Sequence, residues 1–491
     1  MPPTMAPPDS GVTVRMYRPG IGDCFLLAFR AADGDDRARY MLIDCGVLVG
    51  TPGGADRMRD IAKDIAEATG GHVHVLVATH EHWDHLSGFQ YANETFEDVS
   101  IDEVWLAWTE DPDDELAERL RQKHALALKG VLAAVDQLER ADEERAKSMA
   151  GAINDVLDFH RELGIEGRIN TTAEQMEYVH GRGAPPRYRR PGEPPIALPG
   201  VEGVRIYVLG PPENEARLSK SDPSTTDSEV YERALALSEA NAFYLAALAA
   251  GDRDALSAGQ GELWERSHPF HPPVPIAMDE AGEHEVHGDF FRARYFGPGE
   301  EGEDVAWRRI DTDWLGAAGQ LALDLDNDTN NTSLALAIEL TESGQVLIFP
   351  ADAQVGNWLS WHDVSWPGEG DCEEDALTGG DLIRRTVLYK VGHHGSHNAT
   401  LREKGLEMME IPDLVAMIPV NGEHAEDREW AMPFPPLFAR LEEKTKGRII
   451  RADTGLPAER PERLSESEWE SFLVNVEEDP DELWIQITVT G

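Results

Sequence analysis

The feature of the sequence that most constrains its fold and chemistry is a run of metal-ligand residue types directly after an apolar segment. Residues 80–85 read His-Glu-His-Trp-Asp-His and follow the apolar segment 73–79. Histidine accounts for only 17 of the 491 residues, so chance is a poor explanation for three within six positions. Imidazole suits Zn, Fe, Ni or Cu, and a neighbouring carboxylate adds Mn. We expect the cluster to lie at the end of a buried strand, in a loop that contains Gly88; the alternative is a polar turn with surface histidines.

Composition excludes several classes of protein. The formal net charge of -48 disfavours tight, non-specific binding of duplex nucleic acid, because such a chain repels polyanions. No apolar stretch approaches the roughly 20 residues that span a bilayer, so no membrane partner is expected. Residues 1–8 lack the basic-then-apolar order of a secretory signal, and Cys24, Cys45 and Cys372 imply no disulfide framework. We therefore expect a cytoplasmic protein, and its oligomeric state stays open.

Hydrophobic patterning predicts an α/β protein that opens with strands and continues with alternating strands and helices. Helical segments are expected at 55–67, within 111–163 and at 228–250. Strands are expected at 13–17, 25–29, 40–44, 73–79, 204–209, 334–340, 345–349, 386–391 and 414–419. We expect one domain over 11–455, interrupted by insertions at about 108–200 and 222–310. The remaining segment, 456–491, is expected to be a tail with a possible edge strand at 483–489.

One segment of this acidic chain is distinctly basic. Residues 182–190 contain four arginines, Arg182, Arg187, Arg189 and Arg190. The segment is typical of a solvated loop. The alternative is a loop that reaches over the metal site and holds an anionic substrate.

A second set of ligand types follows two later strands. Asp352 comes after the apolar segment 346–349, where its carboxylate is well placed to bridge two metals. His393 and His394 come after 388–391 and precede Gly395. A lone Asp after a strand is usually a turn or cap residue. Three strand ends with complementary ligands nevertheless favour one shared site.

Together these motifs resemble the metallo-β-lactamase fold superfamily, and the resemblance implies an αβ/βα sandwich with two large insertions. Other motifs resemble the ComEC-type hydrolase domain of DNA uptake and its soluble relatives. These motifs are Gly20-x-Gly22-Asp23-Cys24, Leu42-Ile43-Asp44 and Asn330-Asn331-Thr332-Ser333-Leu334. The resemblance covers about 11–90, 200–212 and 326–420.

The resemblance also implies roles for individual residues around two divalent metal ions, Zn with Mn or Fe as alternatives. The implied metal ligands are His80 and His82 for metal one, Asp84 and His85 for metal two, Asp352 as the bridge and His394 to complete metal two. Asp84 would also orient the attacking water, and His393 would lie near the substrate as a proton donor. The assignment of His393 and His394 could be reversed. Ser396 and Asn398 would contact the substrate and stabilise developing negative charge.

Two departures from the family pattern affect the predicted site. Many relatives carry a further ligand histidine between the first cluster and the bridging Asp, and no motif identifies one here. We expect the candidate histidines to lie at the surface: His124, His160, His180, His268, His271, His284 and His287. The second departure is Pro350-Ala351-Asp352, where relatives commonly have Thr-Gly-Asp; the carboxylate is kept but the preceding turn differs.

The resulting functional hypothesis is a metal-dependent hydrolase that acts on a small or single-stranded phosphodiester. Since this fold hosts several chemistries, an ester, lactone or thioester hydrolase is the first alternative. The second is a metal-binding interaction protein without catalysis, in which the insertions serve as contact surfaces. Against it, structural zinc sites usually have four protein ligands, often cysteines, and the cysteines here lie outside the histidine cluster.

Overall fold

The structure, a computed structural model, describes residues 5–32, 38–141, 144–163, 169–220, 278–296, 317–367 and 376–491. The expected helical block 228–250, His268, His271 and Cys372 lie outside these ranges. Contacts divide the chain into two units, each described by itself below. The first comprises Met1–Arg119, Asp158–Ala234 and Asp326–Gly491, and the second Leu120–Leu157 and Leu235–Leu325. Within the described ranges no helix combines the length and apolar character needed to cross a membrane.

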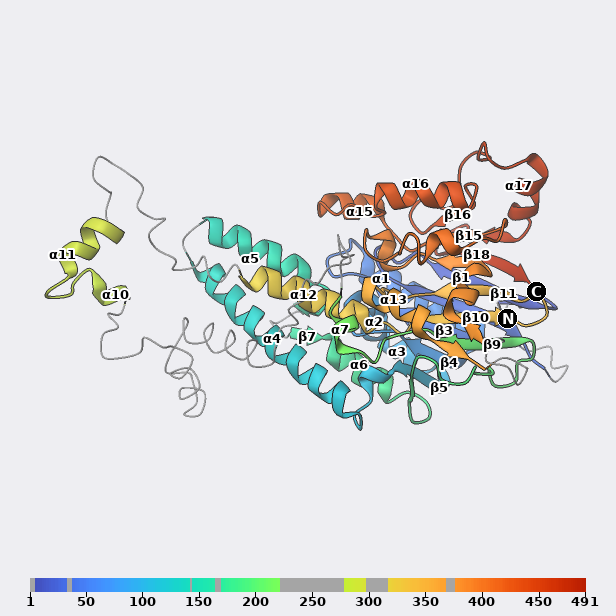
Figure 1. Ribbon diagram of the computed structural model, residues 1–491, viewed down its shortest axis with the longest axis horizontal. Coiled ribbons are helices and arrows are strands. Elements are labelled where there is room, and N and C mark those ends of the chain that lie inside the picture. Colours follow the sequence, from blue (N-terminus) through green and yellow to red (C-terminus); the bar gives the residue numbers. More distant parts are fainter. Residues whose placement is uncertain are drawn as a thin grey trace. The chain divides into compact units, whose positions relative to one another are not determined.

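The first unit contains two large β-sheets (Figure 1). The larger has the strand order β17-β18-β1-β2-β3-β4-β5-β8. Its strands are β1 Gly11–Tyr17, β2 Cys24–Arg30, β3 Ala38–Cys45, β4 His72–Ala78, β5 Ser100–Ala107, β8 Arg187–Arg189, β17 Val476–Glu478 and β18 Trp484–Thr490. Strands β3, β4, β5 and β8 run parallel, and the remaining pairs are antiparallel.

The smaller sheet has the order β16-β15-β14-β11-β10-β9. Its strands are β9 Val204–Val208, β10 Leu336–Leu340, β11 Gln345–Phe349, β14 Thr386–Lys390, β15 Val415–Ile418 and β16 Ile449–Arg451. Alternate side chains of both sheets form one continuous apolar core; for example, Val14, Ile43 and Val77 of the larger sheet belong to the same cluster as Ile338 and Leu388 of the smaller. The sheets therefore pack face to face, as two half-apolar surfaces must.

Helices cover the outer face of each sheet. On the larger sheet they are α1 Gly54–Thr69, α2 Trp83–Tyr91, α3 Asn93–Glu97 and α6 Thr172–His180. On the smaller sheet they are α13 Val355–Ser360, α14 Gly379–Arg384 and α16 Pro435–Lys444. Further helices are α7 Glu215–Leu218, α15 Gly422–Asp427 and α17 Glu466–Leu473, and small strands are β6 Arg161–Leu163, β7 Ile169–Thr171, β12 Ser365–Trp366 and β13 Leu377–Thr378. The first unit is thus a helix–sheet–sheet–helix arrangement, and the α/β class is confirmed.

The second unit is helical where it is described. Helices α4 Glu115–Arg140, α5 Glu144–Leu157 and α12 Ala317–Asn331 contribute to one apolar cluster that includes Val131, Ile153 and Leu321. Helices α4 and α12 each continue into the first unit. Two short helices, α10 Met278–Ala281 and α11 Gly288–Phe291, are also described.

Three details differ from the sequence-based predictions. The predicted strand at 483–489 exists as β18, but it is not an edge strand, because β1 and β17 pair with its two sides. Gly88 does not lie in a loop: it belongs to α2, where a Cβ atom would lie 2.6 Å from Cys45 Sγ. The basic segment 182–190 is in part strand β8, which extends the larger sheet beside β5.

Candidate metal centre

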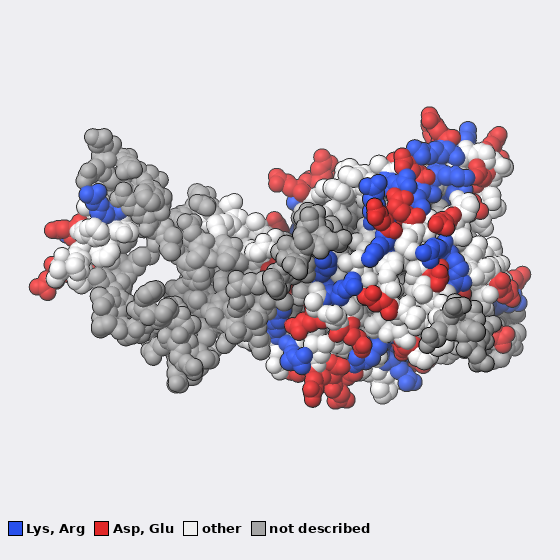
Figure 2. Space-filling view, viewed as in Figure 1, with Lys and Arg blue, Asp and Glu red and all other residues white. Residues whose placement is uncertain are grey.

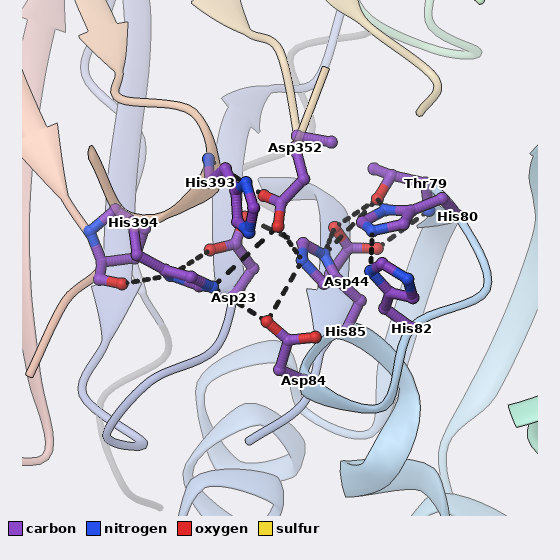
Figure 3. Close-up of polar contacts among 12 residues, drawn as sticks. Asp23, Asp44, Thr79, His80, His82, Asp84, His85, Asp352, His393 and His394 are labelled. Carbon is purple, nitrogen blue, oxygen red and sulfur yellow. Dashed lines mark hydrogen bonds and ion pairs between the residues drawn. The ribbon is translucent and has the colours of Figure 1, made fainter. Parts of the chain in front are cut away.

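The predicted ligands meet at one edge of the two sheets. His80, His82, Asp84 and His85 follow β4 or begin α2, Asp352 follows β11, and His393 and His394 follow β14. Because β11 and β14 run parallel, their carboxyl ends deliver these residues to the same edge. Figure 3 shows the side chains of all three segments turned toward one another. Each of the seven residues is at most 6% exposed, so the cluster is buried.

Four ligand atoms surround one point. His394 Nε2 lies 2.8 Å from Asp84 Oδ2, and His85 Nε2 lies 3.2 Å from Asp352 Oδ2. The remaining separations, His85 Nε2 to Asp84 Oδ2 and His394 Nε2 to Asp352 Oδ2, are 3.7 and 4.0 Å. Ligands at about 2.0–2.2 Å from a tetrahedral Zn²⁺ lie about 3.3–3.6 Å apart, which these distances bracket. Ligand atoms of Asp23, His85, Asp352 and His394 lie within 4.8 Å of one another and could hold a metal ion, and Asp84 Oδ2 lies within 3.7 Å of Nε2 of both histidines.

Asp23 lies close to the same two histidines, but on the other side of their rings. Its carboxylate oxygens are 4.0 Å from His85 Nδ1 and 3.9 Å from His394 Nδ1. It also forms a buried ion pair with Lys390, whose Nζ lies 3.4 Å from Asp352 Oδ1. We therefore assign Asp84, rather than Asp23, to the four atoms that face the common point.

Hydrogen bonds fix which nitrogen of each histidine is open. The Nδ1–H group of His85 donates to Asp44 Oδ2 at 2.8 Å, and that of His394 donates to the carbonyl oxygen of Pro419 at 2.6 Å. Both rings are thereby held with Nε2 directed at the common point. A carboxylate or carbonyl acceptor on the far nitrogen is the usual support of a metal-binding histidine.

A second pair of ring nitrogens faces each other nearby. His80 Nε2 and His82 Nδ1 are 3.1 Å apart. The Nδ1–H group of His80 donates to Thr79 Oγ1 at 3.0 Å, and this hydroxyl donates to Asp44 Oδ2 at 2.8 Å. The neutral ring of His80 therefore carries its lone pair on Nε2. In the metal-free protein the Nδ1–H group of His82 can donate to this lone pair, whereas the other tautomer of His82 would leave both nitrogens open as ligands for one metal ion.

The charges of the cluster shift the pKa values of its members in opposite directions. Burial lowers the pKa of His85, but Asp352, Asp44 and Asp84 outweigh burial and hold the pKa well above 6.5. The pKa of His394 is also raised above 6.5 despite burial, mainly through the hydrogen bond to Asp84. The pKa values of His80 and His82 lie well below 6.5, because burial and neighbouring histidines disfavour the charged form.

His393 lies beside Asp352 in the same cluster, but one of its ring nitrogens has a different partner (Figure 3). Its Nδ1 lies 3.1 Å from Ser396 Oγ, and this hydroxyl donates to Asn398 Oδ1 at 3.1 Å. Burial lowers the pKa of His393 to about 4. His393 and His394 both have positive φ, 42° and 51°, and the non-glycine residues Asp44 and Ala351 share this backbone conformation. Such strained positions concentrate at functional sites.

Sequence reasoning missed two residues beside His82. The prediction that His160 lies at the surface is wrong: His160 is 1% exposed, and its ring centroid lies 4.8 Å from that of His82. The segment turns inward because Phe159 accepts a 2.7 Å hydrogen bond from Trp83 N and stacks on Trp430. Asp326 of α12 lies on the same side, with Oδ1 3.7 Å from His82 Nε2. Of the other candidates, His124, His180 and His284 are half-buried and His287 is exposed.

Asp44 was noticed in the sequence only as part of a family-like motif, without a role. It is fully buried, accepts hydrogen bonds from Thr79 and His85, and forms no ion pair with Lys or Arg in the described part of the chain. The signal for this role was present, since Asp44 ends a predicted apolar strand as Asp352 does.

The arginines of the basic segment have structural partners. Arg189 stacks on Trp105 at 4.1 Å, and Arg190 forms ion pairs with Asp114 at 2.6 Å and Glu213 at 2.8 Å. Arg182 donates to backbone carbonyl oxygens of Phe96 and Val99. These contacts hold the segment against β5 and the start of α4, which favours neither a free solvated loop nor a loop over the metal cluster.

Comparisons with protein-family models, with curated proteins and with solved structures found no match.

Proposed function

We propose that this protein is a metal-dependent hydrolase with a metallo-β-lactamase-type fold. The observation that carries the proposal is the convergence of four ligand atoms from three strand ends, with both histidines held so that Nε2 stays open. The helix–sheet–sheet–helix layering supports the same family. A purely structural zinc site would not need a bare carboxylate oxygen, yet Asp84 Oδ1 has no hydrogen-bond partner among the described residues.

The donor set fits two divalent ions of the zinc type. Asp84, His85, Asp352 and His394 would hold one, and the His80–His82 pair would hold the other, with Asp352 as the shared ligand. Such ions, when bound, supply an acidified water molecule and a Lewis acid for the oxygens of the scissile group. The nitrogen and carboxylate ligands suit Zn²⁺ best, with Mn²⁺ or Fe²⁺ as alternatives.

The protein's own residues would divide the remaining tasks. Asp84 presents Oδ1 as an acceptor that can orient a water molecule. His393, neutral at pH 7, is held by Ser396, and an anionic substrate beside it would raise its pKa and let it protonate a leaving oxygen. Asn398 accepts a hydrogen bond from the Ser396 hydroxyl and so fixes its orientation. Ser396 and Asn398 would therefore orient His393 and also contact the substrate. The buried setting strengthens each of these interactions.

A phosphodiester is the substrate class that we favour. An open hollow of about 1100 Å³ lies beside the ends of β1 and β15, and four arginines line it: Arg18, Arg57, Arg428 and Arg451. The proposed ligands do not line this hollow, but Pro419, which accepts the hydrogen bond of His394, directly precedes its lining residue Val420. Arg57 donates to the backbone carbonyl oxygens of Arg18 and Glu482, and it forms no ion pair with a carboxylate in the described ranges. Its charge is thus available to a phosphate. The hollow also contains acidic residues, which disfavours a long polyanion.

The decisive experiment measures metal content and hydrolysis together. Wild-type protein and Asp84→Ala would be analysed for bound metal and assayed on bis(p-nitrophenyl) phosphate, a lactone panel and a thioester panel. We expect about 10²-fold or greater loss of phosphodiesterase activity in the variant, with loss of metal. Asp64→Asn serves as the control, because Asp64 pairs with Arg15 and Tyr17 away from the cluster.

Each alternative function has its own outcome. Hydrolysis confined to the lactone or thioester panel would replace the phosphodiesterase assignment while keeping the metal centre. Bound metal without hydrolysis of any panel member would favour a non-catalytic, interaction role. Unchanged activity of Asp84→Ala would remove the proposed centre altogether.

A further inference from the structure

A separate group of ligand atoms lies on the far side of His82. The side chains of His82, His160 and Asp326 each offer one ligand atom, and these atoms lie within 4.8 Å of one another. All three residues are at least nine-tenths buried and belong to the first unit. They come from the segment after β4, from the segment after α5 and from α12.

The polar atoms at this position are poorly satisfied by the protein. Asp326 Oδ2 accepts a 3.2 Å hydrogen bond from Asn330, but Asp326 Oδ1 and His82 Nε2 have no hydrogen-bond partner among the described residues. Their separation of 3.7 Å is too long for a hydrogen bond and suits two ligands of one metal ion. Within the described ranges no Lys or Arg pairs with Asp326, so an ionised carboxylate at this position would have no positive side chain beside it. Leaving two such atoms unpaired is costly.

This position is distinct from the proposed hydrolytic centre. His82 Nδ1 faces His80, whereas His82 Nε2 faces Asp326. The two ring nitrogens point in opposite directions, so one metal ion cannot use both. A cation beside Asp326 would therefore be a different ion; with ions on both sides, His82 would bridge them as an imidazolate, and its remaining ring proton would be released to solvent on metal binding.

We propose that His82, His160 and Asp326 bind a divalent transition-metal ion of their own, with Zn²⁺ as the best-suited ion. Two imidazoles and one carboxylate form an open three-ligand set, to which a water molecule adds the fourth position. The 3.7 Å between His82 Nε2 and Asp326 Oδ1 is close to the separation of about 3.3–3.6 Å between two ligands of one tetrahedral Zn²⁺, and a ring nitrogen of His160 lies within 4.8 Å of both atoms. The ion would tie the segment after β4 to the two places, near Asp158 and Asp326, where the chain re-enters the first unit.

The test counts zinc in protein that has been stripped and reloaded with Zn²⁺ alone. The variants are His160→Gln and Asp326→Asn, which keep side-chain size and hydrogen-bonding capacity, and the control is His362→Gln, whose ring contacts a backbone carbonyl elsewhere. We expect each variant to lose one Zn²⁺ per chain, and the control to lose none. Zn²⁺ should also raise the Tm of the wild type more than that of either variant. Circular dichroism verifies folding, and if one variant fails to fold the other decides.

A double variant separates this site from the proposed hydrolytic centre. If the sites are separate, His80→Ala combined with His160→Gln loses one more Zn²⁺ than His80→Ala alone. Equal losses in His80→Ala, His160→Gln and the double variant would mean that His80 and His160 share one ion, which would overturn the proposal. Wild-type zinc content in both His160→Gln and Asp326→Asn would also overturn it. Loss of zinc in these variants but not in His80→Ala would instead support this site and count against the two-metal centre.

Discussion

At the scale of single residues, Asp44 determines which nitrogens of two histidines are open. It accepts the Nδ1–H group of His85 directly and that of His80 through the Thr79 hydroxyl. One carboxylate therefore sets the tautomers of one ligand from each proposed metal position. Removing its charge leaves the ligands in place but lowers the basicity of both rings.

We predict that Asp44→Asn lowers zinc affinity by about 10- to 100-fold, as is typical for the loss of such a supporting carboxylate. The positive φ of Asp44 suits Asn well, so the backbone should be undisturbed. Competition with a chelator measures the affinity. The matched control is Asp64→Asn, which removes a carboxylate paired with Arg15 and should leave zinc affinity unchanged. Equal affinities of Asp44→Asn and wild type would contradict the role of Asp44.

The raised pKa values of His85 and His394 predict proton competition with the metal. Both rings must be neutral to bind through Nε2, and both hold their protons above pH 6.5 in the metal-free protein. Affinity is therefore full above the raised pKa values and is lost as the pH falls through them, by up to about 100-fold per pH unit when two protons compete. Zinc titrations from about pH 8.5 to about pH 5.5 measure the slope. Affinity that stays constant over this range would contradict the assignment of these two ligands.

At the scale of secondary-structure elements, strand β18 contributes more than a tail would. It lies between β1 and β17, and Ile485 and Ile487 are buried in the core between the sheets. Residues 456–491 were predicted as an appended tail because the segment lies outside the family-like motifs. Strands β1 and β18 pair although they lie at opposite ends of the sequence, and no local pattern indicates such a pairing. Hydropathy therefore predicted the strand but not its position in the sheet.

We predict that Ile485→Ala lowers the free energy of unfolding by about 2–5 kcal/mol, the usual range for truncating a fully buried aliphatic side chain. Val489→Ala in the same strand, where the side chain is only partly buried, should cost less. Urea unfolding of the metal-free protein measures both. Similar, small losses in the two variants would mean that β18 is a peripheral strand.

The candidate site was predictable to the extent that its ligands follow apolar strands. His80, His82, Asp84, His85, Asp352 and His394 were found in this way, because a strand followed by ligand types is a local pattern. His160 was a candidate that we expected at the surface, and Asp326 was not considered. His160 follows α5 and Asp326 lies within α12, and the periodicity of a helix says nothing about its tertiary contacts. Asp326 is also one of three aspartates within five residues, and only the packing of α12 distinguishes it.

At the scale of the whole molecule, a net charge of -48 surrounds a site that we propose for anionic substrates. On the face shown in Figure 2, Lys and Arg side chains lie among Asp and Glu side chains and form no single positive field. Long-range repulsion should therefore slow the approach of a polyanion, whereas the buried ligands act only at short range. This repulsion depends on ionic strength, because the Debye length falls from about 30 Å at 0.01 M to about 8 Å at 0.15 M.

We predict that KM for a single-stranded oligonucleotide falls as ionic strength rises from about 0.01 M to about 0.15 M, since screening removes the repulsion between like charges. KM for bis(p-nitrophenyl) phosphate, with one negative charge, should fall less, and KM for an uncharged lactone or ester should not change. Steady-state rates on the three substrates at matched pH and zinc concentration provide the measurement. A KM for the oligonucleotide that rises with salt would mean that attraction at the arginine-lined hollow outweighs the net charge, and longer single strands would then be the better substrates.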